Sequence, residues 1–164
     1  MRPYVITFVV ALVLGLAGGV ALGVFAYPYV FLADIVASEK VDKPAGVERK
    51  TVARGTFVHA NPSDPIHYGR GKVTIYDAGL LHLEPDFEVG PGPKYHVYLV
   101  PEKEVTPSTN VARTMFVDLG RVKAFKGSQN YEVPGGVDIA KYGSVVIWCE
   151  QFGVLISPAK LGPP

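Results

Sequence analysis

Few residues in this chain can carry redox or metal chemistry. Cys149 is the only cysteine and stands beside the only tryptophan, Trp148, in the apolar run from Ser144 to Phe152. A single thiol cannot form a disulfide within its own chain. Cys149 is therefore a packed apolar group, a redox or metal-binding sulfur, or the partner of a cysteine in another molecule.

Histidine and methionine offer the other possible metal ligands. Small β-domains that move electrons often hold copper with two histidines, one cysteine and a weak axial methionine. No histidine or methionine follows Cys149, so the downstream half of a blue-copper loop is missing, as is the Cys-x-x-Cys-His motif of covalent haem. No motif identifies a cofactor, and the metal-ligand candidates that remain are His59, His96 and Met115.

Several classes of function lack support. The chain has 16 Lys plus Arg against 15 Asp plus Glu, a net charge of +1, so no strong field draws in nucleic acid and we expect none as a partner. We find no Ser-His-Asp order, paired carboxylates, phosphate loop or zinc spacing. Hydrolase or transferase activity is therefore unsupported, and a redox role remains open.

Short strands must position these residues. The 18 glycines and 14 prolines, with alternating apolar residues between them, predict an all-β fold rather than long helices. We expect a single β-sandwich, jelly-roll or immunoglobulin-like, of about eight or nine strands. The predicted strands are 55–58, 71–76, 81–83, 95–100, 114–119, 121–125, 131–133, 144–149 and 154–156, and the turn 77–79 closes a hairpin.

Strand alternation places Cys149 on one face of its strand. Cys149 shares that face with Val145 and Ile147, whereas Trp148 and Glu150 point to the other. Because both faces are largely apolar, one interpretation is an inert core thiol with a raised pKa. A reactive thiol would instead need exposure and a nearby cation, for which Lys141 and Lys160 are the candidates.

The N-terminal segment predicts one transmembrane helix. Residues 5–26 follow a short tail, 1–4, and carry no charge, which is long enough to cross a bilayer. A cleaved signal peptide ending near Ala26 is the alternative, but its apolar region is usually shorter. We favour an uncleaved signal anchor in the cell membrane with the amino terminus in the cytoplasm and the domain extracytoplasmic.

Two further features of the N-terminal region bear on the anchor hypothesis. Gly15, Gly19 and Gly23 recur on one helical face, where a second helix could approach closely, so helix dimerisation is possible. Residues 27–54 have no sustained apolar periodicity and are interpreted as a juxtamembrane segment and stalk, which leaves 55–164 as the folded domain.

Five stretches of the predicted domain resemble one family. They are Leu81–Phe87, Gly92–Leu99, Asp118–Gly120, Lys126–Pro134 and Tyr142–Phe152. In this order they are similar to the DM-thirteen domain of Skeletor-type extracellular proteins and bacterial membrane-anchored proteins. The resemblance implies a single β-domain with an electron-transfer role through a characteristic cysteine, which corresponds to Cys149.

Two hypotheses about function follow. In the first, the protein is a membrane-anchored extracytoplasmic redox module in which Cys149 cycles to a sulfenic state or mixed disulfide, or binds a metal or cofactor. In the second, it is a non-catalytic cell-surface module that binds a protein or glycan, and Cys149 is a core residue.

Overall fold

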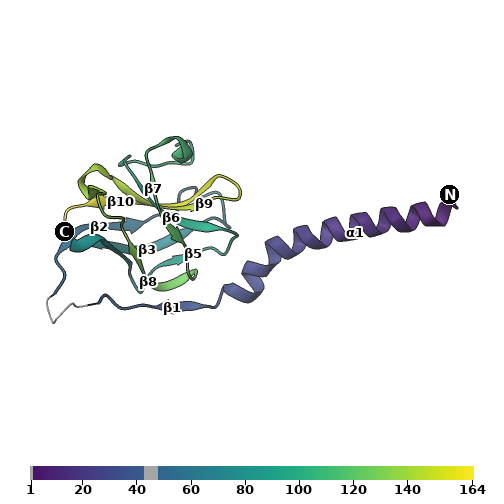
Figure 1. The fold of residues 1–164 in the computed structure, drawn as a ribbon, viewed down its shortest axis with the longest axis horizontal. Coiled ribbons are helices and arrows are strands. Elements are labelled where there is room, and N and C mark those ends of the chain that lie inside the picture. The colour runs from purple at the N-terminus through teal and green to yellow at the C-terminus, as the bar shows by residue number, and fades with distance from the viewer. Residues whose placement is uncertain (1, 43–47) are drawn as a thin grey trace.

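The protein consists of a long N-terminal helix joined to a β-domain (Figure 1), as seen in a computed structural model that describes residues 2–42 and 48–164. Met1 of the predicted tail and residues 43–47 of the predicted stalk, Lys43 included, lie outside the described residues. Helix α1 (Pro3–Tyr27) continues into a π-helical turn, η1 (Pro28–Leu32). Together they form a 30-residue segment that contains an 18-residue window of mean hydropathy 2.6, long and apolar enough to cross a membrane.

Ten strands make up the sheet that the described residues form. They are β1 (Val36–Ser38), β2 (Thr51–Phe57), β3 (Gly69–Tyr76), β4 (Leu80–Leu83), β5 (Glu88–Val89), β6 (Tyr95–Val100), β7 (Val117–Arg121), β8 (Lys126–Glu132), β9 (Ser144–Cys149) and β10 (Val154–Gly162). Short 3₁₀ turns occur at η3 (Asp77–Gly79), η4 (Val111–Arg113) and η5 (Ile139–Lys141).

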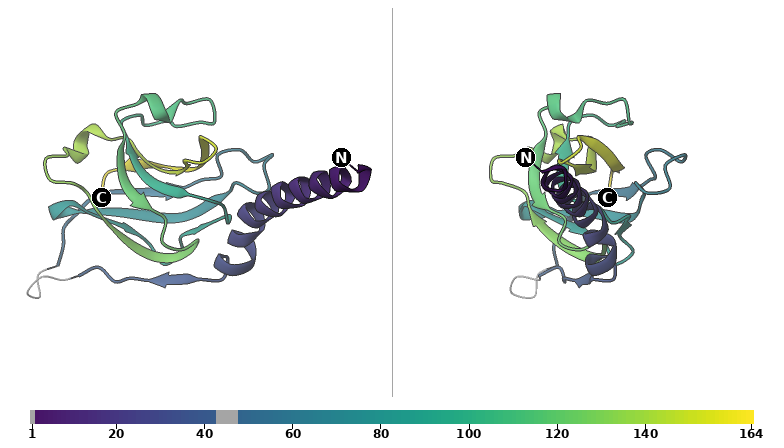
Figure 2. Two further views of the ribbon diagram at one scale, coloured as in Figure 1. Left: turned by 45° about the vertical axis from the view of Figure 1, so that its right-hand side comes forward. Right: turned by 90° about the vertical axis from the view of Figure 1, so that its right-hand side faces the viewer.

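The strands follow one continuous path, β1-β8-β4-β3-β2-β10-β9-β6-β7, with β5 joined to β3 and β8. All described pairs are antiparallel except β1 with β8. The sheet curves so that its strands face one another across a shared core, and α1 runs away from one end of the domain (Figure 2). The predicted all-β fold with one N-terminal helix is confirmed.

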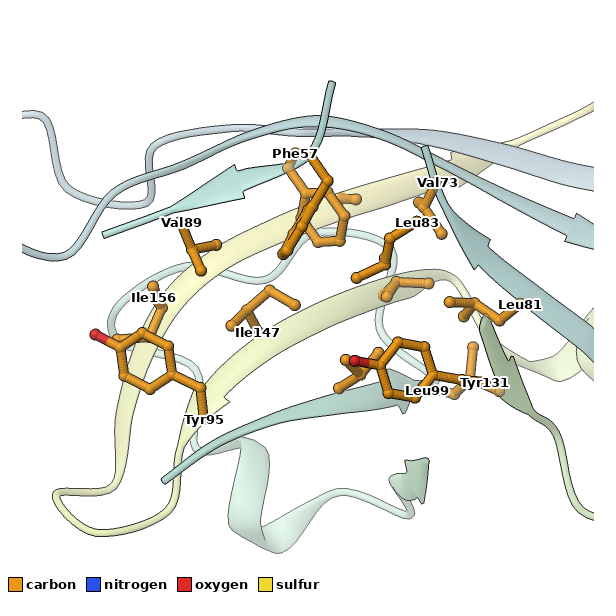
Figure 3. Packing of buried hydrophobic residues seen from close by; sticks show 14 of the residues in the cluster. Phe57, Val73, Leu81, Leu83, Val89, Tyr95, Leu99, Tyr131, Ile147 and Ile156 are labelled. Atoms are coloured by element: carbon orange, nitrogen blue, oxygen red, sulfur yellow. The ribbon is translucent and has the colours of Figure 1, made fainter. Parts of the chain in front are cut away.

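The main core is filled by the inward side chains of most strands. Figure 3 shows large residues from strands distant in sequence converging in one space, among them Phe57, Leu81 and Ile147. Burial of such side chains contributes about 1.5–3 kcal/mol each, which is the main force that closes the sheet.

A second apolar cluster covers the outside of the sheet at β6, β9 and β10. It joins Val146 and Trp148 of β9 to Tyr98 of β6, beneath Val105 and Val111 of the 101–116 loop. This loop explains why all six residues of β9 are buried although only alternate ones face the main core. Val145, Ile147 and Cys149 face the main core, so the predicted strand alternation is confirmed.

Several segments differ from the expectation. Strand β2 begins at Thr51, within the residues predicted as stalk, and β5 has no predicted counterpart. Strand β1 lies in the predicted stalk, and Ser128 Oγ donates to Glu39 O at 2.8 Å beside it. Its pairing is made by backbone groups of exposed residues, so it leaves no apolar alternation in the sequence. The segment 121–125, predicted as a strand, is mostly a loop because the amides of Lys123 and Ala124 donate to the side chain of Gln129.

The helix meets the domain at the end where β6 begins and β9 ends. The ring of Phe25 in α1 stacks on Phe152 in the turn after β9, with centroids 5.7 Å apart. Leu32 of η1 packs against the main core. We call this the anchor-facing end of the domain.

Candidate functional site

Cys149 lies at the anchor-facing end, as the last residue of β9. Its Cα pairs with Tyr95 of β6 on one side and Val154 of β10 on the other. The residue has 0% exposure, and its Sγ donates a hydrogen bond of 3.3 Å to Pro93 O. Burial raises the pKa of the thiol, so the sulfur holds its proton at neutral pH.

Tyr95 is the neighbour of Cys149 on the inner face. It is 3% exposed, and its hydroxyl has no hydrogen-bond partner among the described residues. Burial, and to a smaller degree the nearby Cys149, raise the pKa of this phenol far above its ordinary value. The inner face therefore pairs two weak acids that both keep their protons.

The two lysines proposed to activate Cys149 lie elsewhere. Lys160 pairs in register with Ser144, the first residue of β9, and forms an ion pair with Glu104. Lys141 precedes β9 and its Nζ lies 4.0 Å from Asp138. Both lysines are therefore at the opposite end of β9 from the thiol, and neither can lower its pKa.

A cavity of about 830 Å³ separates the anchor from the domain near Cys149. Tyr27 and Leu32 line it from the helical side, and Pro93, Tyr95 and Gln151 line it from the domain. Pro93 accepts the hydrogen bond of the thiol and Tyr95 is its strand partner. Cys149 thus lies directly behind the cavity wall.

The outer face of the same strand ends carries a charged cluster. Nδ1 of His96 lies 3.0 Å from Oδ2 of Asp118, and Nε2 lies 3.4 Å from Oε2 of Glu150. Tyr98 donates to Oε1 of Glu150 at 2.8 Å, and Lys94 Nζ lies 3.0 Å from Oε2. We call these five residues the outer cluster.

Three strands bring the outer cluster together. His96 and Tyr98 alternate on β6, Asp118 pairs with Tyr98 from β7, and Glu150 follows β9. Lys94 adopts a left-handed backbone with φ of 53°, at the point where the loop turns into β6. The hydrogen bond from Lys94, then that from Tyr98, lowers the pKa of Glu150, so this carboxylate is charged at neutral pH.

Only one of the three predicted metal ligands lies in a ligand cluster. Within residues 2–42 and 48–164, His96, Asp118 and Glu150 form the one group of three whose ligand atoms lie within 4.8 Å of one another. His59 lies outside it, with Nε2 2.8 Å from Asp64 O, and Met115 is 82% exposed.

The sequence did not identify Tyr95 as a neighbour of Cys149, or Asp118 and Glu150 as neighbours of His96. Alternation places Glu150 on the outer face with Trp148, which was a usable signal. The approach of Asp118 depends on the pairing of β6 with β7, which no local spacing encodes.

The fold and the site define a β-domain, joined to a candidate membrane span, that holds a buried thiol and a charged cluster at its anchor-facing end. A family model described as electron transfer DM13 matches residues 62–161, more than half of the chain. The chain belongs to the DM13 family, and the resemblance found in the sequence is confirmed. No curated protein and no solved structure matches the chain.

Proposed function

We propose that this protein is a membrane-anchored, extracytoplasmic electron-transfer module whose redox reaction is centred on Cys149. The family description supports electron transfer, and the apolar helix supports a membrane anchor. The observation that carries the assignment to Cys149 is its position at the end of β9, bonded to a loop that lines the cavity beside the anchor.

The chemistry that suits a solitary extracytoplasmic thiol is exchange with a disulfide of another molecule. Cys149 loses its proton to solvent, the thiolate attacks one sulfur of the partner disulfide, and the other partner sulfur leaves as a thiolate. Because burial raises the pKa of Cys149, this step requires a local opening. The exposed turn 150–153 and the loop 90–94 are the segments that would open.

A small disulfide tests this proposal. The full chain in detergent micelles would be incubated with cystamine under native conditions and its mass measured. We expect one mixed disulfide per chain, reversible by a reductant, and none in Cys149→Ser. Since the chain has a single cysteine, every adduct reports on this residue. A protein that stays unmodified until denaturant unfolds it would overturn the redox role.

A second candidate function is a non-catalytic cell-surface module that binds a protein or glycan. The complete burial and raised pKa of Cys149 favour it, because these are the properties of an inert core thiol. Under this alternative Cys149→Ser lowers the free energy of unfolding but leaves partner binding intact in the folded fraction. Under the redox proposal the variant folds and loses exchange.

We further propose that two anchors associate through Gly15, Gly19 and Gly23. The space beside each of these glycines is open within 4 Å, so a second helix can approach the backbone there. Gly19→Leu would block this approach, whereas Ala21→Leu, the same enlargement on the opposite face of the helix, would not. Crosslinking in membranes should give dimers of the Ala21→Leu chain and monomers of the Gly19→Leu chain.

A further inference from the structure

We infer that the outer cluster binds a divalent transition-metal ion between Nε2 of His96 and the carboxylate of Glu150, with Asp118 orienting the imidazole. This site does not depend on the redox role of Cys149. It lies on the opposite face of β9 and uses different groups.

The hydrogen positions on His96 point to a cation. Both carboxylate oxygens of Asp118 lie within 3.1 Å of Nδ1 of His96. Because a carboxylate can only accept, the tautomer that makes this hydrogen bond carries its hydrogen on Nδ1. Nε2 then presents a lone pair, is buried and has no hydrogen-bond partner among the described residues. Metal-binding histidines commonly have this arrangement, with a carboxylate on the other nitrogen.

The spacing of the two ligand atoms also fits. Nε2 of His96 and Oε2 of Glu150 lie 3.4 Å apart, and neither carries a hydrogen in this tautomer. Two lone pairs that face each other repel unless a positive charge lies between them. Tetrahedral bonds of about 2.0–2.1 Å to zinc separate neighbouring ligand atoms by about 3.3–3.4 Å.

The surroundings leave room for more ligands. Tyr98 fixes Oε1 of Glu150 and leaves Oε2 to face the histidine. Asp118 stays on Nδ1 of His96, and water molecules can complete the shell. Imidazole with carboxylate suits Zn²⁺, Mn²⁺, Fe²⁺ or Cu²⁺, whereas soft Cu⁺ prefers sulfur, which faces the other side of β9.

Lys94 is the competitor for this position. Its Nζ lies 3.0 Å from Oε2 of Glu150, and its side chain is 51% exposed, so it can move into solvent. A metal ion would displace the ammonium from the carboxylate. Removal of Lys94 should therefore strengthen metal binding.

Titration with the metal alone tests the site. The full chain in detergent, without a polyhistidine tag, would be titrated with Zn²⁺ by calorimetry and with Co²⁺ by absorption spectroscopy. We expect one saturable site, with affinity about 10- to 100-fold weaker in Asp118→Asn. Glu150→Gln and His96→Gln should lose at least as much, Lys94→Met should bind more tightly, and the control His59→Gln should bind as the native chain does.

Two results would overturn the inference. One is the absence of saturable binding in both the native chain and Lys94→Met. The other is binding that Glu150→Gln and Lys94→Met leave unchanged, which would place the ion elsewhere. Tryptophan fluorescence would verify folding of each variant, and the tighter binding expected of Lys94→Met cannot arise from unfolding.

Discussion

At the end of β9 the two faces of the sheet carry very different groups, although Cys149 and Glu150 are consecutive residues. On the inner face, Cys149 has 0% exposure and lies beside Tyr95, and burial raises the pKa of both. On the outer face, Glu150 stays charged among His96, Lys94 and Tyr98. Strand alternation thus places a neutral, enclosed thiol next to a partly exposed charged cluster. Chemistry at the thiol therefore needs a local opening of the backbone, whereas an ion reaches the cluster once the exposed Lys94 ammonium moves aside.

The largest expected difference between the faces is in stability. Ile147, next to Cys149 on the inner face of β9, has 0% exposure, so Ile147→Ala should lower the free energy of unfolding by about 2–5 kcal/mol. Ile66→Ala, at a site 51% exposed, is the matched control and should change it by less than about 0.5 kcal/mol. Urea unfolding would measure both, and equal values would contradict the assigned core.

The next difference is in the response to alkali. The pKa of Cys149 is raised in the folded state, so its stabilising effect is complete below the unfolded pKa, about 8.5, and is lost as pH rises through the folded pKa. The free energy of unfolding should therefore fall as pH rises above about 8.5, and fall less in Cys149→Ala. Identical pH profiles would show that the thiol is not enclosed.

The outer face should respond to acid, and by less. The pKa of Glu150 is lowered, so its stabilising effect is complete above the unfolded pKa, about 4.3, and is lost as pH falls through the folded pKa. Because Lys94 is 51% exposed, the pair should contribute about 1 kcal/mol or less. Glu150→Gln should flatten the acid limb and leave the alkaline limb unchanged, as measured by urea unfolding across pH.

The contrast between the faces also shows what the sequence could reveal. That Cys149 shares a strand face with Val145 and Ile147 was predictable because alternation is a local pattern. That this face points into the main core was not, because both faces of the strand are apolar. The outer cluster was not, because His96, Asp118 and Glu150 come together only through the pairing of β6 with β7 and β9. Of its members, only His96 was identified from the sequence.

The sequence also failed to predict several short and irregular elements. Strands β1 and β5 have three and two residues, too few for an alternation to be visible. The apolar residues at 122–125 resembled a strand, but that backbone forms a loop because the amides of Lys123 and Ala124 donate to Oε1 of Gln129, whose Nε2 donates to Ala124 O. These hydrogen bonds form only when the Gln129 side chain folds over the preceding loop. They leave no periodic pattern in the sequence.

The central claim is that Cys149 reacts through a local opening at the anchor-facing end. The direct measurement is the rate at which a thiol reagent labels Cys149 in the native chain and in Leu81→Ala. Leu81 is fully buried on β4, several strands away from β9, and its loss should cost about 2–5 kcal/mol of global stability.

If a local opening exposes the thiol, the two chains should be labelled at the same rate, because that opening leaves the core around Leu81 intact. If labelling instead requires global unfolding, Leu81→Ala should be labelled about 30-fold faster or more. That acceleration would identify Cys149 as an inert core residue and contradict the redox proposal.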